Sequence, residues 1–195
     1  REKFPEWWAH QSDRDDIAIN CAVKSSPILT SGHGHIVSLR AGIHLIASDI
    51  SLGGTYTDLV GAGYQKTILR MTEQWKPVEW LDASQWPGRG HAAAIWIGSE
   101  FGGTNASFGT NVRGLTLDCG LASLAHVNKR VSGISSKSWV EECSIIENVA
   151  VTGASGASIG FPGHGGGVAV LNGLSIRAFH LGGAMFKDSL GLLFT

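Results

Sequence analysis

Residues 113–118, RGLTLD, are echoed twice further along the chain, by ENVAVT at 147–152 and by NGLSIR at 172–177. Each copy places Gly or Asn ahead of an apolar–any–apolar triplet. The second and third copies begin 25 residues apart, and the first and second begin 34 apart, with a predicted lateral loop in GLASLAHVNKRVS (120–132). A period in the mid-twenties, made of short strands without helices, indicates a β-solenoid whose turns bury their inward faces by stacking.

Strand-sized apolar runs continue on both sides of these copies, each bounded by Gly, Asn, Asp, Ser or Pro. No helix of ten or more residues separates them, which disfavours a doubly wound sheet with crossover helices. We therefore expect an all-β solenoid of about six or seven coils after residue 32, from the mid-twenties period. Its inward rows are predicted to contain Leu115, Leu117, Val149, Val151, Leu174 and Ile176.

Two positions in the echoes concern the corners of the coil. Asn148 and Asn172 each stand just before an echoing strand, 24 residues apart. Asn tolerates left-handed and turn backbone angles better than most residues. We expect Asn148 and Asn172 to stack as neighbours at one corner.

The segment DLVGAGYQKTILRM at 58–71 raises the question of a phosphate-binding loop, because Gly61 and Gly63 precede Lys66-Thr67. A phosphate loop requires its glycines between a strand and the N-terminus of a helix. Here the run after Thr67 is short and strand-like, and Pro77 follows soon after. The segment is thus interpreted as a tight corner between two strands.

The only helical pattern lies near the N-terminus, where Asp13, Asp15 and Asp16 precede apolar residues. The spacing predicts a short helix over 15–25 with one apolar face and acids at its positive end. The face is expected to contain Ile17, Ala18, Cys21 and Ala22. We divide the chain into an N-terminal segment at 1–31 and a solenoid at 32–195, expected to be incomplete at its C-terminal end.

Composition excludes several classes of protein. The chain has 195 residues, a formal net charge of −1 and no basic run, so a nucleic-acid face is disfavoured. It has no apolar stretch of 18 residues, which disfavours a membrane span. Cys21, Cys119 and Cys143 form no C-x-x-C pair, and Cys119 and Cys143 fall at different points of the repeat, so we expect all three to stay unbridged. We expect no metal and no cofactor.

Four stretches taken in order resemble the pectate-lyase-like superfamily: 13–23, 32–52, 58–71 and 112–119. The resemblance implies a right-handed, single-stranded parallel β-helix whose N-terminal end is capped by a short helix. The superfamily includes polysaccharide lyases, glycoside hydrolases, epimerases and the trimeric tailspikes of bacteriophages. Most catalytic signatures of its enzymes are missing here, and a lone Gly-His-Gly at 163–165 is interpreted as a turn.

Candidate chemistry remains sparse in the linear sequence. Asp118 and Glu147 flank echoing strands and are the candidate catalytic carboxylates if the chain is a glycosidase. The competing interpretation is that they are ordinary solvated acids on the outside of a coil. Three tryptophans share a Pro-containing polar loop: Trp75, Trp80 and Trp86. Flat aromatic faces bind sugars, so these three are the predicted carbohydrate-binding residues, and the competing interpretation is that they pack the loop onto the solenoid.

The resemblance leaves two hypotheses of different class. The first is a structural or receptor- and polysaccharide-binding domain of a virion, similar to a tailspike or tail fibre, self-associating as a homotrimer or within a larger assembly. The second is an extracellular polysaccharide lyase or glycoside hydrolase. The apolar run LGLLFT at 190–195 would leave an open edge, so we expect further coils or a partner chain to cover it.

Overall fold

The computed structural model describes most of the chain from Glu2 to Phe194. The described residues are 2–7, 14–25, 35–52, 57–80, 90–97, 107–108, 110–136, 140–141, 144–157, 159–161, 169–172, 175–178, 184–186 and 193–194.

Parallel sheets dominate these residues, and every strand pairing recorded in them is parallel. The large sheet, here sheet A, contains β1 (Glu2–Lys3), β2 (His35–Ser38), β3 (Gly42–Ile46), β5 (Thr57–Val60), β6 (Thr67–Met71), β9 (Asn111–Asp118), β12 (Ser144–Ala154), β14 (Ala169–Asn172), β15 (Ser175–Ala178) and β17 (Leu193–Phe194). Sheet B contains β4 (Ile50–Leu52), β7 (His91–Ile97), β10 (Arg130–Ser136), β13 (Ile159–Phe161) and β16 (Ala184–Phe186). A small third sheet pairs β8 (Ser107–Phe108) with β11 (Val140–Glu141).

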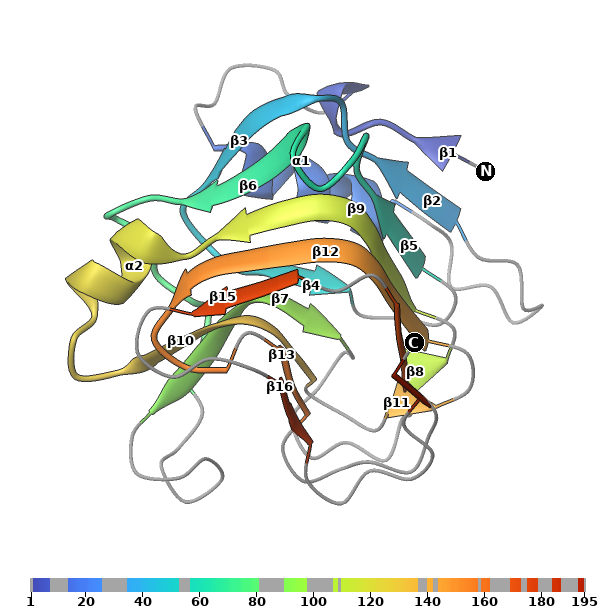
Figure 1. The fold of residues 1–195 in the computed structure, drawn as a ribbon. Coiled ribbons are helices and arrows are strands. Elements are labelled where there is room, and N and C mark those ends of the chain that lie inside the picture. Colours follow the sequence, from blue (N-terminus) through green and yellow to red (C-terminus); the bar gives the residue numbers. More distant parts are fainter. Residues whose placement is uncertain are drawn as a thin grey trace.

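The chain passes repeatedly from sheet A to sheet B and back. Strand β9 pairs through residues 111–113 with β5 and through residues 116–118 with β6, so one long strand continues two shorter ones. Strand β12 pairs with β9 along most of its length. On its other side, β14 pairs with residues 144–147 of β12, and β15 pairs with residues 150–154. Figure 1 shows the result, a curled sheet A in which β3, β6, β9, β12 and β15 lie one below the other in chain order.

The inward rows of sheet A are apolar and buried, as the sequence echoes predict. Leu115 pairs with Val149 and Leu117 with Val151, and all four side chains are fully buried. The prediction is confirmed for these four residues. Strand β15 places Ile176 beside Val151, while Leu174 lies outside the described residues.

The Gly61–Thr67 segment is a corner between β5 and β6, as the sequence indicates. The N–H of Gly61 donates to the carbonyl of Arg113 at 2.9 Å, and the N–H of Gly63 donates to that of Gly114 at 2.8 Å. The N–H groups of Lys66 and Thr67 donate to the carbonyl of Gly63. Because these donors are bonded within the protein, the segment offers no nest for a phosphate.

At equivalent positions in β9 and β12, the backbone adopts the left-handed region. Gly114 has φ 61° and Asn148, one coil further, has φ 52°. A Cβ on Gly61 would lie 2.4 Å from the carbonyl oxygen of Gly114, so both glycines are required by the close approach of two backbones. The prediction for Asn148 is correct in its backbone angle. The predicted stacking on Asn172 is wrong, because Asn172 pairs with Glu147.

A helix does form near the N-terminus: α1 spans Asp15–Lys24, after the 3-10 turn η1 (Pro5–Trp7). Its apolar face differs from the predicted one by about one position. Ala18, Ile19, Ala22 and Val23 are buried, whereas Ile17 and Cys21 are exposed. The reason lies in tertiary contacts, since Ile19 and its neighbours pack into the core cluster.

Polar side chains of α1 bond the backbone of the first coil. The Asp15 carboxylate accepts from the N–H of Leu45 at 2.8 Å, and Asp16 accepts from that of Ala47 at 3.0 Å. Asn20 accepts from the N–H of Ser51 and donates to the carbonyl of Asp49, both at 3.0 Å. These side chains satisfy backbone groups at the start of the stack that have no preceding strand to pair with.

Cys21 and Cys119 form no disulfide, and Cys143 lies outside the described residues. In the parts of the chain that the structure describes, no helix is long and apolar enough to cross a membrane.

Candidate carbohydrate-binding site

A cluster of rings joins two segments that are distant in the sequence. The first is the loop after β6, at 72–80, and the second is the turn after α2 (Gly120–Ala125). The loop is fixed by backbone bonds: the N–H of Lys76 donates to the carbonyl of Ala47 at 3.0 Å, and the N–H of Val78 donates to the Asp49 carboxylate at 2.7 Å. Helix α2 protrudes beyond the edge of sheet A in Figure 1.

Three rings meet edge to face in this cluster. Trp75 and Trp80 lie 5.9 Å apart between centroids, with their planes at 88°. The His126 ring lies 5.2 Å from Trp80 and 6.0 Å from Trp75. Such geometry is favoured by aromatic quadrupoles and locks each ring in one orientation.

A hydrogen bond fixes the tautomer of His126. Its Nε2 lies 2.8 Å from the carbonyl oxygen of Trp75, and a carbonyl can only accept. Nε2 therefore carries the proton when the ring is neutral, and Nδ1 keeps its lone pair. No hydrogen bond to this Nδ1 is made by the described residues.

A cation completes the cluster. The Nζ of Lys129 lies 5.6 Å from the centroid of the Trp80 ring, which is cation–π distance. The N–H of Lys129 donates to the carbonyl of His126 at 2.9 Å, so the turn itself positions the lysine. Trp80 and His126 are both half-buried and partly accessible to solvent, whereas Trp75 is fully buried.

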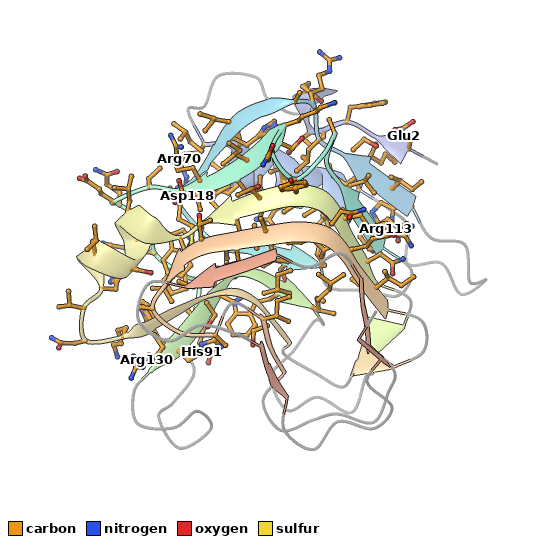
Figure 2. The ribbon with its side chains drawn as sticks, viewed as in Figure 1. Glu2, Arg70, His91, Arg113, Asp118 and Arg130 are labelled. Carbon is orange, nitrogen blue, oxygen red and sulfur yellow. The ribbon has the colours of Figure 1, made fainter. Side chains whose placement is uncertain are left out.

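The outer face of sheet A carries pairs of opposite charge. Arg70 bonds Asp118 at 2.9 Å between Nε and Oδ2, and the Nε of Arg113 lies 3.9 Å from Glu147. Figure 2 shows Arg70 beside Asp118 at one end of the sheet and Arg113 towards the other. Each of these two carboxylates therefore has an arginine within ion-pair distance.

Strand β7 of sheet B contains a buried histidine, His91. The His91 ring lies 3.2 Å from Ser132 Oγ through Nδ1 and 3.2 Å from Ser135 Oγ through Nε2, and it packs against Trp96 at 5.4 Å. Burial lowers the pKa of His91 to about 3, partly offset by the backbone of Arg130. His91 is therefore neutral at physiological pH, and full burial keeps it from any dissolved substrate.

The sequence matches no protein-family model and no curated protein at a significant level. Among solved structures it is similar to two A-modules of mannuronan C-5 epimerases from Azotobacter vinelandii. The AlgE6 module has TM-score 0.53 and 15% identity, with 93% of this chain and 57% of that chain covered. The AlgE4 module has TM-score 0.54 and 15% identity, with 95% and 51% covered.

The likeness to these modules, together with the parallel sheets, is consistent with a parallel β-helix of the pectate-lyase-like fold. The parallel sheets and the corner at Gly61 agree with the resemblance drawn from the sequence. At this identity the likeness concerns the fold alone, and the chain spans only slightly more than half of each epimerase module.

Within this pectate-lyase-like fold, the three predicted sugar-binding tryptophans have different positions. Trp75 is fully buried, so it offers no face to a sugar in solution and serves as the packed base of the cluster. Trp80 is the half-buried ring beside Lys129. Trp86 lies outside the described residues, and its prediction stays untested.

Asp118 and Glu147 are not brought together by the β-helix. Asp118 pairs with Thr152 and Glu147 with Arg113, at opposite ends of the contact between β9 and β12. Glycosidase carboxylates lie about 5–10 Å apart on either side of a sugar bond. The structure gives each acid an arginine instead of an acidic partner.

His126 and Lys129 were not predicted as site residues. They lie in the stretch 120–132 that the repeat spacing identifies as a lateral loop, so the only available signal was its length and its two adjacent basic residues. No group of three or more His, Cys, Asp or Glu side chains suited to a metal ion occurs among the described residues.

Proposed function

We propose that this chain is a polysaccharide-binding β-helix domain and that Trp80 is part of its binding surface. The observation that carries the proposal is the Trp80 ring, half-buried and held at 5.2–5.9 Å from His126 and Trp75, with Lys129 beside it. A ring that is already fixed loses little conformational freedom when a sugar packs on it.

The chemistry of the cluster suits a sugar. The C–H face of a pyranose packs on a flat aromatic ring, while its hydroxyl groups require directional hydrogen-bond partners nearby. Lys129 Nζ can donate, and His126 Nδ1 can accept. The solved structures with similar folds are named for their action on mannuronan, a polysaccharide, which agrees with this proposal.

The finer proposal retains the expectations from the sequence. The strands would form a complete right-handed solenoid closed at its N-terminal end by α1, and the domain would serve in a virion as a tailspike-like receptor-binding element. Homotrimeric packing or further coils would cover its last strands. Sedimentation of the purified chain tests this part, since a monomer at all concentrations would count against the trimer.

An extracellular lyase or hydrolase is the alternative from the sequence. Among the described residues the two candidate acids are each paired with an arginine, which favours binding over catalysis. The absence of ultraviolet-absorbing unsaturated products and of new reducing ends, with polymer bound, would support the binding function.

The test of the proposed function is binding to a panel of immobilised polysaccharides with three proteins. Trp80→Ala should lower the affinity for the bound polymer at least tenfold, since aromatic truncation removes the packing surface. Val78→Ala is the matched control, because Val78 is 82% exposed in the same loop and makes no ring contact. Equal affinity of the Trp80→Ala variant and the unchanged protein would refute the proposal.

A further inference from the structure

We propose that Lys129 makes the Trp80 surface selective for sugars that carry a negative charge, as a carboxylate or a sulfate. This inference rests on the proposed function and names the class of ligand and the residue that selects it. It concerns the surface formed by Trp80, His126 and Lys129, at the base of the protruding α2 segment.

The charge of Lys129 is not neutralised by the described part of the protein. Four arginines there lie within 4 Å of a carboxylate: Arg14, Arg40, Arg70 and Arg113. No described carboxylate lies that close to Lys129, whose contact is the Trp80 ring. A cation–π contact at an exposed site is weak, so an anion can displace it at small cost.

The neighbouring sequence favours an anion as well. Residues 119–136 contain no Asp or Glu but carry Lys129 and Arg130. Arg130 is occupied by the carbonyl of Ser155 at 3.2 Å, which leaves Lys129 as the cation beside the ring. The nearest acid along the chain from Trp80 is the adjacent Glu79, which is exposed.

The backbone at Lys129 and the His126 ring are held in place before any ligand arrives. The bond from Lys129 N–H to the His126 carbonyl and the bond from His126 Nε2 to the Trp75 carbonyl tie the turn to the rings. A sugar packed on Trp80 would place its charged substituent within reach of Nζ, and a hydroxyl would donate to His126 Nδ1. Lys, a compact and strongly hydrated cation, would recognise charge without demanding the bidentate geometry of Arg.

The test uses three forms of one polymer: polymannuronate, its carboxyl-reduced neutral form, and the sulfated derivative of that reduced form. The unchanged protein should bind a charged form about tenfold more tightly than the neutral form. Lys129→Met keeps the apolar stem but removes the charge, and should bind charged and neutral forms within about twofold of each other. Preference for the carboxylated or for the sulfated form identifies which anion the surface takes.

Glu79→Gln is the charge control: it changes the net charge by one unit in the direction opposite to Lys129→Met, in the segment next to Trp80. If the preference arises at Lys129, this variant should keep it within about twofold. A preference that survives Lys129→Met, or that Glu79→Gln alters as strongly, overturns the inference. The proposed function would still stand in that case if Trp80→Ala lost binding to all three forms, whereas both would fail if the unchanged protein bound none.

Discussion

Strands β6 and β7 follow one another along the chain, yet they have opposite patterns of burial. In β6 of sheet A, Thr67, Leu69 and Met71 are buried while Ile68 and Arg70 alternate with them at half exposure. In β7 of sheet B, all seven residues from His91 to Ile97 are buried. One sheet therefore has a solvated outer face, and the other is covered on both faces.

The two sheets also differ in how their polar side chains are satisfied. On sheet A, charged residues meet as partly exposed pairs such as Arg70 with Asp118, and water shares in their solvation. On sheet B, the two ring nitrogens of the buried His91 lie within hydrogen-bond distance of Ser132 and Ser135. A buried polar group without a partner costs far more than an exposed one, so sheet B should be much less tolerant of change.

The largest expected effect comes from truncating matched isoleucines on the two sheets. Ile95→Ala removes a fully buried side chain of β7 and should lower the free energy of unfolding by about 2–5 kcal/mol. Ile43→Ala, in β3 where the side chain is 52% exposed, should change it by less than about 0.5 kcal/mol. Urea denaturation of both variants measures the contrast, and equal losses would remove the distinction between the sheets.

Acid should weaken the protein through sheet B. Because burial lowers the pKa of His91 to about 3 from its ordinary 6.5, the unfolded chain binds a proton at this residue between these values and the folded chain does not. Stability from this group is complete above pH 6.5 and is lost as pH falls towards 3, at up to about 1.4 kcal/mol per pH unit.

The measurement is urea denaturation of the unchanged protein and of His91→Gln between pH 7 and pH 4. The variant lacks the titrating group, so the difference in unfolding free energy between the two proteins should narrow steadily as the pH falls. A constant difference across this range would mean that His91 can be protonated in the folded protein.

The smallest effect is expected on the outer face of sheet A. Arg70→Gln removes the pairing with Asp118, whose two side chains are 37% and 29% exposed, and should lower the free energy of unfolding by less than about 1 kcal/mol. The loss should shrink further at 1 M salt, where exposed charges are screened. A loss as large as that of Ile95→Ala would show that this face is more buried in the working protein than its exposure indicates.

Much of the architecture could be predicted from local patterns. The echo at 113–118 and 147–152 gave the register of Leu115 on Val149, because a solenoid repeats the same inward positions in successive coils. The helix at Asp15–Lys24 was predictable from its acids and apolar spacing. Its buried face was not, since the choice between Ile17 and Ile19 depends on where the first coil lies against it.

The repeated pattern predicts the strands of sheet A, the corner at Gly61–Thr67 and the buried positions of Leu115 and Leu117, because each follows from residues close along the chain. The burial of Trp75 depends on tertiary contacts, such as the one with His126, 51 positions away along the chain. The ion pair of Asp118 likewise depends on tertiary structure, because its partner Arg70 is 48 positions away along the chain. Contacts between loops that are far apart in the sequence depend on how the connecting segments are placed in space. The periodic pattern of apolar residues does not predict such contacts.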